Sequence, residues 1–327
     1  MGLFRSFGTL WVCIELLLFL HIWALGKFPA CFKLTQAETS VAGQPYCGNS
    51  SDSVNVTINN AADATTLATA CPTIWGNVYI EPGSSGDINL DGILNITGSL
   101  KPNGDSAEFT NTQITSITSS SLIQIDGELS VYHAPLLQKI AFPNLQRVSY
   151  SIFFVDAESL TTVDLSSLET GGGWLRLAQV PNLTTFIYPL TMNTQGDGSV
   201  GLTETALTHV NGFTSTPYAF YVANSPFVEG IAVEISETRC LLTSDSSWEW
   251  TGSVIFAQNS AAVNISLPNL ASTGGQLVLG NCSALSIPAL NRVNGTFNMI
   301  NATFKHLEAP NLGLINGSLN ITGSFSG

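Results

Sequence analysis

Ionisable side chains are few in this sequence, and their spacing suggests no centre for acid–base chemistry. Charged residues make up 10% of the 327 residues, and no Asp or Glu directly follows another. Hydrolysis of a polysaccharide generally needs a pair of converging carboxylates. The nearest clusters, Asp156 with Glu158 and Glu234 with Glu237, are expected to be solvated surface. The histidines lie apart from one another and from any cysteine: His133, His209 and His306. The sequence therefore predicts no enzyme, no cofactor and no metal site.

The N-terminus has the features of a secretory signal peptide. A positive charge precedes a mostly apolar run, which ends in Ala24-Leu25-Gly26 with small residues at the positions that a signal peptidase prefers. A retained membrane anchor is the alternative, but Glu15 and His21 lie inside the run, and charge at the centre of a bilayer is costly. We expect residues 1–26 to be removed, residues 27–46 to be poorly structured, and the mature chain to be exported.

Export to an oxidising compartment would allow the remaining cysteines to pair. Cys47 and Cys71 are close in sequence and bracket one structural unit, and closing such a loop contributes about 3 kcal/mol in the chain-entropy model. Cys240 and Cys282 would then form a second pair by elimination, which leaves Cys31 without a partner. The alternative is that these residues are buried free thiols.

Asn-x-Ser/Thr sequences are frequent and could carry N-linked glycans. They occur at Asn49, Asn55, Asn95, Asn182, Asn264, Asn281, Asn294, Asn301, Asn316 and Asn320. Asn95 and Asn320 stand in the same Leu-Asn-Ile-Thr context, in which strand alternation would turn a glycan toward solvent. We expect most of these asparagines to be glycosylated in an exported chain.

Trp248 and Trp250 form the one aromatic cluster that is a candidate contact surface. Paired tryptophans can stack on sugar rings or anchor a protein interface, although in loops they more often pack onto the core. The net charge of −13 argues against nucleic acid or an anionic membrane surface as a partner.

The elements that would position these residues come from a repeat of about 22 residues. From Gly252 on, the sequence returns to Gly-x-apolar-x-apolar followed by Pro-x-Leu. The clear openings stand at Gly252, Gly275, Gly295 and Gly317. Alternation of apolar and polar residues is typical of a half-buried strand, and stacking such units builds one continuous core. The period lies in the range of leucine-rich and related solenoid repeats.

Weaker copies extend the pattern through residues 76–327. Their openings stand at Gly76, Gly92, Gly127, Gly173 and Gly198, with degenerate ones at Tyr150 and Tyr218. Residues near 101–121 and 234–251 break the pattern and are expected as insertions, and the last rung is incomplete.

Residues 47–75 would close the first rung as an N-terminal cap. They carry an alternating strand at 53–58 and a short helix at 60–71, capped by Asn60 or Asp63. We therefore predict an all-β, right-handed parallel β-solenoid, like a receptor L domain or a leucine-rich repeat. It would have about ten ~22-residue rungs and a short helical, disulfide-stapled cap.

An ordered set of motifs carries a resemblance to a known family. The motifs are CPTIWGNVYI from Cys71, LTTVDLSSLET from Leu160, VPNLTTFIYPL from Val180 and NGSLNITGSFSG from Asn316. Over roughly residues 45–327 the chain resembles the fungal GPI-anchored cell-wall proteins of the extracellular-mutant and sporulation-specific group. Their repeats are similar to the receptor L domain of insulin and epidermal growth factor receptors.

The resemblance implies a non-enzymatic glycoprotein that is secreted or held at the cell surface and contributes to cell-wall organisation and integrity. Wall polysaccharide or wall glycoproteins are its expected partners. A membrane would be contacted only through a GPI anchor, whose signal does not follow the last repeat here. Two alternatives stay open. One is an extracellular, L-domain-like recognition module that uses a flat face or the Trp248/Trp250 loop; the weaker one is a polysaccharide-active β-helix enzyme.

Overall fold

The protein is described by a computed structural model. It covers residues 47–102, 113–188, 193–194, 198–212, 219–226, 228–233, 253–257, 259, 263–303 and 307–324. The chain divides into two compact units, residues 1–39 and 40–327, and all described residues belong to the second. The expected signal peptide and segment 27–46 lie outside the described residues. Among the helical residues that are described, none form a helix long and apolar enough to cross a membrane.

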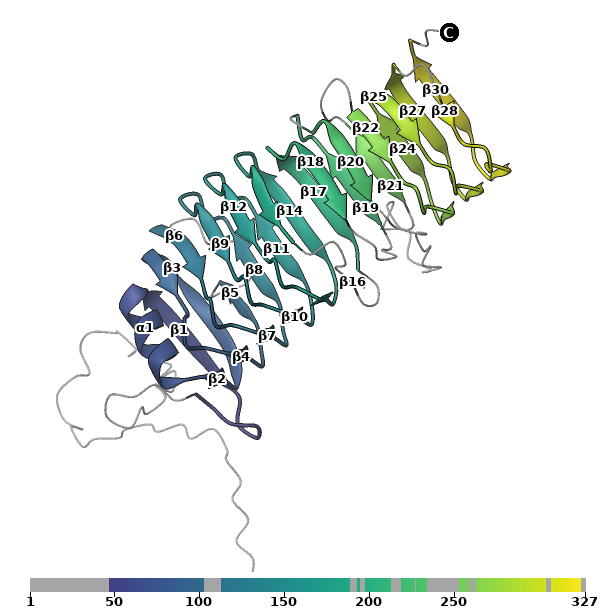
Figure 1. Cartoon of the computed structure of the whole chain (residues 1–327). Helices are drawn as coiled ribbons and strands as arrows, with labels where there is room; N and C mark the ends of the chain where they lie inside the picture. Colours follow the sequence, from purple (N-terminus) through teal and green to yellow (C-terminus); the bar gives the residue numbers. More distant parts are fainter. Residues whose placement is uncertain are drawn as a thin grey trace, which may run out of the picture. The chain divides into compact units, whose positions relative to one another are not determined.

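The described chain folds as a parallel β-solenoid whose rungs build three faces (Figure 1). Face one contains β1 (Val54–Asn60), β3 (Gly76–Asn89), β5 (Leu100–Pro102), β8 (Leu129–Tyr132), β11 (Ile152–Val155), β14 (Leu175–Val180), β17 (Val200–Thr205), β19 (Phe220–Ala223), β21 (Val254–Ala257), β24 (Leu277–Gly280), β27 (Phe297–Ala302) and β30 (Leu319–Gly323). Its strands follow one another along the stack from β1 to β30.

The other two faces consist of shorter strands. Face two contains the end of β3 and then β6 (Gln113–Thr118), β9 (Lys139–Ala141), β12 (Thr162–Asp164), β15 (Thr185–Ile187), β18 (His209–Gly212), β20 (Gly230–Val233), β22 (Val263–Ser266), β25 (Cys282–Ser286) and β28 (Leu307–Glu308). Face three contains β2 (Thr73–Ile74), β4 (Asn95–Ile96), β7 (Gln124–Ile125), β10 (Arg147–Val148), β13 (Thr170–Gly171), β16 (Asn193–Thr194), β23 (Ser272–Thr273), β26 (Arg292–Val293) and β29 (Leu314–Ile315).

The strand register confirms the predicted repeat. Ile152 pairs with Leu129 on one side and with Leu175 on the other, so one rung takes 23 residues here. Longer rungs occur where insertions were expected, because Leu100 pairs with Leu129 and Phe220 pairs with Val254. The fold is therefore the predicted parallel β-solenoid, with rungs of about 23 residues.

One predicted repeat opening is wrong. Gly92 was expected to begin a rung, but it lies in the turn after β3 with a φ of 119° and leads into β4 of face three. The opening on that rung is Gly98, whose amide donates to the Gly76 carbonyl oxygen at 2.9 Å. Gly92 supplies a left-handed turn conformation that other residues rarely adopt, which is why a glycine stands there as well.

The N-terminal cap forms as predicted. The helix α1 (Ala61–Ala70) begins after Asn60, whose side-chain oxygen accepts from the amides of Ala62 and Asp63 at 2.8 and 3.0 Å. Leu67 is one of the apolar side chains that the helix buries against the first rungs. The cap also contributes to the stack itself, because β1 pairs in parallel with β3.

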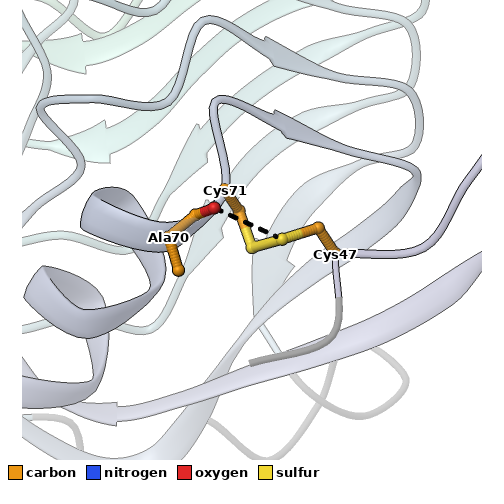
Figure 2. The surroundings of a disulfide bond; sticks show 3 residues. All are labelled: Cys47, Ala70 and Cys71. Atoms are coloured by element: carbon orange, nitrogen blue, oxygen red, sulfur yellow. Dashed lines mark hydrogen bonds between the residues drawn. A yellow bond between two sulfur atoms is a disulfide. The ribbon is translucent and has the colours of Figure 1, made fainter. Parts of the chain in front are cut away.

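The predicted pairing of Cys47 with Cys71 is confirmed. The two residues form a disulfide with their Cα atoms 5.6 Å apart, at the C-terminal end of α1 (Figure 2). The Cys47 Sγ atom also lies 3.7 Å from the carbonyl oxygen of Ala70. The bond therefore holds the start of the described chain against the end of the capping helix.

Inward-facing side chains form one continuous core from the cap to β27. The largest of these that are fully buried are phenylalanines: Phe142, Phe154, Phe220, Phe256 and Phe297. Phe220 and Phe256 meet edge to face with ring centroids 5.7 Å apart. The last described rung is much more open, since Leu319 is 51% exposed whereas Phe297, with which it pairs, is 1% exposed.

Candidate functional site

The outward side chains of face one form a column in which three residue types alternate. In order along the stack the column contains Tyr79, Lys101, Ser130, Phe153, Arg176, Gly201 and Tyr221. The order is aromatic, cation, small, aromatic, cation, small, aromatic. We call these residues the aromatic strip. Their outward direction follows from strand alternation, because the flanking residues of each strand belong to the core.

The aromatic rings of the strip lie close to the neighbouring rungs. The Tyr221 ring covers Gly201, since a Cβ atom on Gly201 would stand 2.1 Å from Tyr221 Cζ. The Phe153 ring centroid is 6.2 Å from that of Tyr132, the next outward residue of β8. At the first rung of the strip, the Lys101 ammonium lies 5.9 Å from the centroid of the Tyr79 ring, within the range of a cation–π contact.

Polar groups of the strip stand beside these rings. Arg176 is exposed, whereas Ser130 is only 2% exposed. The Ser130 hydroxyl has no hydrogen-bond partner in the described part of the chain. Burial raises the pKa of the Tyr221 phenol, and the Arg176 charge opposes that shift. The strip therefore combines tyrosine side chains, guanidinium and ammonium donors and ring faces.

A shallow hollow of about 520 Å³ lies on face two, over β18, β20, β22 and β25. It exists because small residues such as Gly230 and Ala284 pair with larger ones, among them His209 and Asn264. A Cβ atom on Gly230 would lie 3.0 Å from His209 Cδ2. Because Asn264 is one of the predicted glycosylation sites, a glycan on it would cover this hollow.

The corner between faces one and two carries a column of polar residues in the left-handed backbone region. Those among the described residues are His133, Asp156, Gln179, Glu204, Asn224, Asn281 and Asn301, with φ between 51° and 56°. Asn, Asp and His tolerate this region better than other non-glycine residues. His133 Nδ1 and Asp156 Oδ2 form a hydrogen bond between neighbouring rungs, with side chains 35% and 36% exposed. At that exposure the pair contributes little to stability.

Neither this pair nor the aromatic strip was predicted from the sequence. His133 was expected to be isolated and Asp156 to be solvated, although 23 residues, one rung, separate them. The strip occupies the fourth position of each repeat opening, as in GNVYI, YSIFF and YAFYV. Aligning the openings and examining that position by itself would have revealed it.

Of the second predicted disulfide only one cysteine, Cys282, lies in the described residues, and it is not paired there. Cys282 is a free thiol that is fully buried, and its Sγ donates to the Ala284 carbonyl oxygen at 3.1 Å. Strand alternation in β25 turns the Cys282 side chain into the core, away from any partner at the surface. Its expected partner Cys240 lies outside the described residues, as does Cys31.

Burial raises the pKa of the Cys282 thiol to about 12. The native thiol keeps its proton while the unfolded chain loses it near pH 9, so this group's contribution to stability decreases as pH rises from about 9. We expect Ellman's reagent at pH 8 to label this thiol only after unfolding in urea. The matched control is C282A, which should lack the label that the wild-type protein gains on unfolding. If the native wild-type protein already carries one label more than native C282A, the Cys282 thiol is not buried.

All the predicted glycosylation asparagines lie in the described residues. Each is exposed except Asn95 and Asn281, which are partly buried. Asn95 and Asn320 do not share one position as expected, because Asn95 belongs to β4 of face three and Asn320 to β30 of face one. Asn281 is the most constrained: its amide donates to Asn259 O at 3.3 Å and its oxygen accepts from Asn301 at 3.4 Å.

The remaining candidate residues form no reactive centre in the part of the chain that is described. No group of three or more His, Cys, Asp or Glu residues there could hold a metal ion. Trp248 and Trp250, the predicted contact surface, lie outside the described residues.

Comparison with known proteins identifies distant relatives of this chain. No protein-family model matches the sequence, and no solved structure matches it. Protein ecm33 of Aspergillus fumigatus is 26% identical over 250 residues, which is 76% of this chain and 51% of that protein. Cell surface GPI-anchored protein ECM33 of Candida albicans is 29% identical over 126 residues, 38% of this chain and 27% of that protein. Cell wall protein ecm33 of Schizosaccharomyces pombe is 25% identical over 200 residues, 57% of this chain and 46% of that protein.

The fold and the surface define a parallel β-solenoid with a disulfide-stapled cap and a strip of aromatic and cationic residues along one face. Over much of its length, this chain is a distant homologue of the fungal Ecm33 cell-wall and GPI-anchored proteins. The resemblance carried by the motifs is therefore confirmed. The chain spans about half the length, or less, of the curated relatives it matches.

Proposed function

We propose that this chain is an exported, non-enzymatic glycoprotein of the fungal cell surface that contributes to the organisation and integrity of the cell wall. Homology carries the proposal. The chain is similar over 57% of its length to a protein named as a cell wall protein, and over 38% to one named as a GPI-anchored cell surface protein.

Two structural features support an extracellular location. The Cys47–Cys71 disulfide needs an oxidising compartment to form and persist. Exposed asparagines in Asn-x-Ser/Thr sequences recur along the whole stack, from Asn49 to Asn320. Glycans at such positions would point into solvent without disturbing the core.

The test is the location and modification of the native gene product. Epitope-tagged protein should appear in the wall or surface fraction of fungal cells, and treatment with peptide N-glycosidase should lower its mass. Phosphatidylinositol-specific phospholipase C would separate an anchored product from one held only by the wall. An unglycosylated protein confined to the cytosol would contradict the proposal.

A second candidate function, an extracellular recognition module, is favoured by one observation. Within the seven consecutive rungs from Tyr79 to Tyr221, face one carries aromatic and cationic side chains in register on all but the two rungs of Ser130 and Gly201. Such a surface can bind a ligand whether or not the protein also organises the wall.

A further inference from the structure

We propose that the aromatic strip binds a linear, neutral polysaccharide that lies along the stack, across the strands of face one. This inference rests on the proposed function, which places the chain among wall polymers, and it names the surface that would contact them. The strip comprises the residues defined above, from Tyr79 to Tyr221.

The strip has a regular period. Tyr79, Phe153 and Tyr221 stand three rungs apart, with a cation on the rung after each of the first two. At a strand spacing of about 4.8 Å, a ring recurs roughly every 14 Å along the stack. Packing of the core does not require such a period in the outward side chains. A binding surface that repeats by translation is suited to a ligand that repeats by translation, such as a linear polymer.

The placement of the rings also favours a sugar ligand. A small residue precedes Phe153 and Tyr221 on the neighbouring rung, and at Gly201 the Tyr221 ring covers the space that a Cβ atom would fill. A ring that lies over the preceding rung has one face against that rung and the other face toward solvent. Pyranose rings present flat C–H surfaces to such faces, while aromatic side chains with a polar tip can also hydrogen-bond the hydroxyls.

Polar groups lie between the rings of the strip. The exposed Arg176 guanidinium has five donors, and Lys101 contributes an ammonium near Tyr79. The buried Ser130 hydroxyl has no partner within the described residues, although an unpaired buried hydroxyl is costly. Because the Ser130 hydroxyl is closed to solvent, a ligand hydroxyl would satisfy it only where the neighbouring side chains of Lys101 and Phe153 move apart.

Charge decides between neutral and anionic polymers. The chain has a net charge of −13, so its long-range field repels polyanions. Lys101 and Arg176 are therefore assigned to donate hydrogen bonds and to contact rings rather than to attract an acidic polymer. A neutral glucan, mannan or chitin chain has the required flat rings and hydroxyls.

The experiment measures binding of the exported glycoprotein to soluble polymers by isothermal titration calorimetry. The probes are a linear β-1,3-glucan, a chitin oligosaccharide, a mannan and, as the anionic comparison, polygalacturonate. We expect saturable binding to a neutral probe, with little dependence on salt. F153A and Y221A should each weaken it about three- to tenfold, as the loss of one stacked ring implies.

Two control variants distinguish the loss of a contact in the strip from general damage to the fold. Y221F keeps the ring and should bind nearly as wild type. V278A truncates an outward residue of the same column on β24, beyond the strip, and should leave the affinity unchanged. Circular dichroism should show the same fold for all four variants.

The outcomes decide the inference independently of the proposed function. Equal affinity in F153A, Y221A and V278A, or binding only to the anionic probe or to none, would overturn the assignment of the strip. If the wild-type protein resides in the wall but Y221A is retained there equally well, the proposed function stands and this inference fails. If the wild-type protein is absent from the wall, the proposed function itself fails.

Discussion

Replacing Gly127 by Ala should destabilise the solenoid by about 1–3 kcal/mol, because overpacking against a rigid neighbour typically costs this much. Gly127 opens a rung, and its amide donates to the Gly98 carbonyl oxygen of the preceding rung at 2.8 Å. A Cβ atom on Gly127 would lie 2.5 Å from the carbonyl carbon and oxygen of Gly98. These are backbone atoms, so the two rungs would have to separate.

Gly173 provides the matched control for this substitution. It opens a later rung, but its nearest neighbour for a Cβ atom is the Ser151 hydroxyl at 2.9 Å, and the Tyr150 backbone is 3.3 Å away. A hydroxyl can rotate aside, and Gly→Ala also lowers the entropy of the unfolded chain by about 0.4–1 kcal/mol. G173A should therefore be close to neutral.

Urea unfolding of G127A and G173A, compared with wild type, tests this pair. The midpoint should fall clearly for G127A alone, with m-values unchanged. The natural sequence supports the argument: Tyr150 opens the rung after Gly127, and there the amide-to-carbonyl distance is longer, 3.2 Å. Equal midpoints for the two variants would show that the close approach at Gly98 is not a constraint.

The same openings explain how much of the fold the sequence could predict. Leu277, Phe297 and Leu319 each begin a strand two residues after a predicted glycine. Alternation fixes which side chains face inward, and stacking fixes the parallel register. The error at Gly92 has a physical origin. It lies just before the long rung, where the insertion removes the 23-residue spacing that could have shown the motif to be out of phase.

The short strands of face three could not be predicted from the sequence, for a different reason. Strands of face three such as β7 and β10 are two residues long, so they cannot show a period of two. Their strand conformation comes from pairing with the rung on either side, as Arg147 does with Gln124 and with Thr170. That information is in the tertiary structure.

The candidate site was predictable only in part. Cys47 and Cys71 are close in sequence and flank a helix, so local reasoning sufficed for their disulfide. Cys282 was paired by elimination, and elimination takes no account of which way a strand residue points. The aromatic strip and the contact between His133 and Asp156 need the register across rungs, which becomes visible only when the repeats are aligned.

Removing the Cys47–Cys71 disulfide should lower the stability of the folded chain by about 3 kcal/mol. The bond closes a loop with a sequence separation of 24, and the chain-entropy model gives this magnitude for loops of that size. The stability is lost mainly at the N-terminal end of the stack. Trp75 donates its amide to the Cys47 carbonyl oxygen at 2.9 Å, so releasing Cys47 also loosens the segment that leads into β3.

In a solenoid each rung contacts mainly its neighbours, so the loss should be local at first. The double variant C47A/C71A should show faster amide hydrogen exchange in α1, β1 and β3, and unchanged exchange in β24. Reductant should destabilise the wild-type protein and leave the double variant unaffected.

The control for this prediction is C282A, which removes a buried thiol far from the cap and keeps the disulfide. It should remain as sensitive to reductant as the wild-type protein. If the double variant unfolds at the wild-type urea concentration, or if its exchange rises equally in β24, the cap does not protect the end of the core. The stack would then be stabilised chiefly by contacts between its central rungs, among them the edge-to-face pair of Phe220 and Phe256.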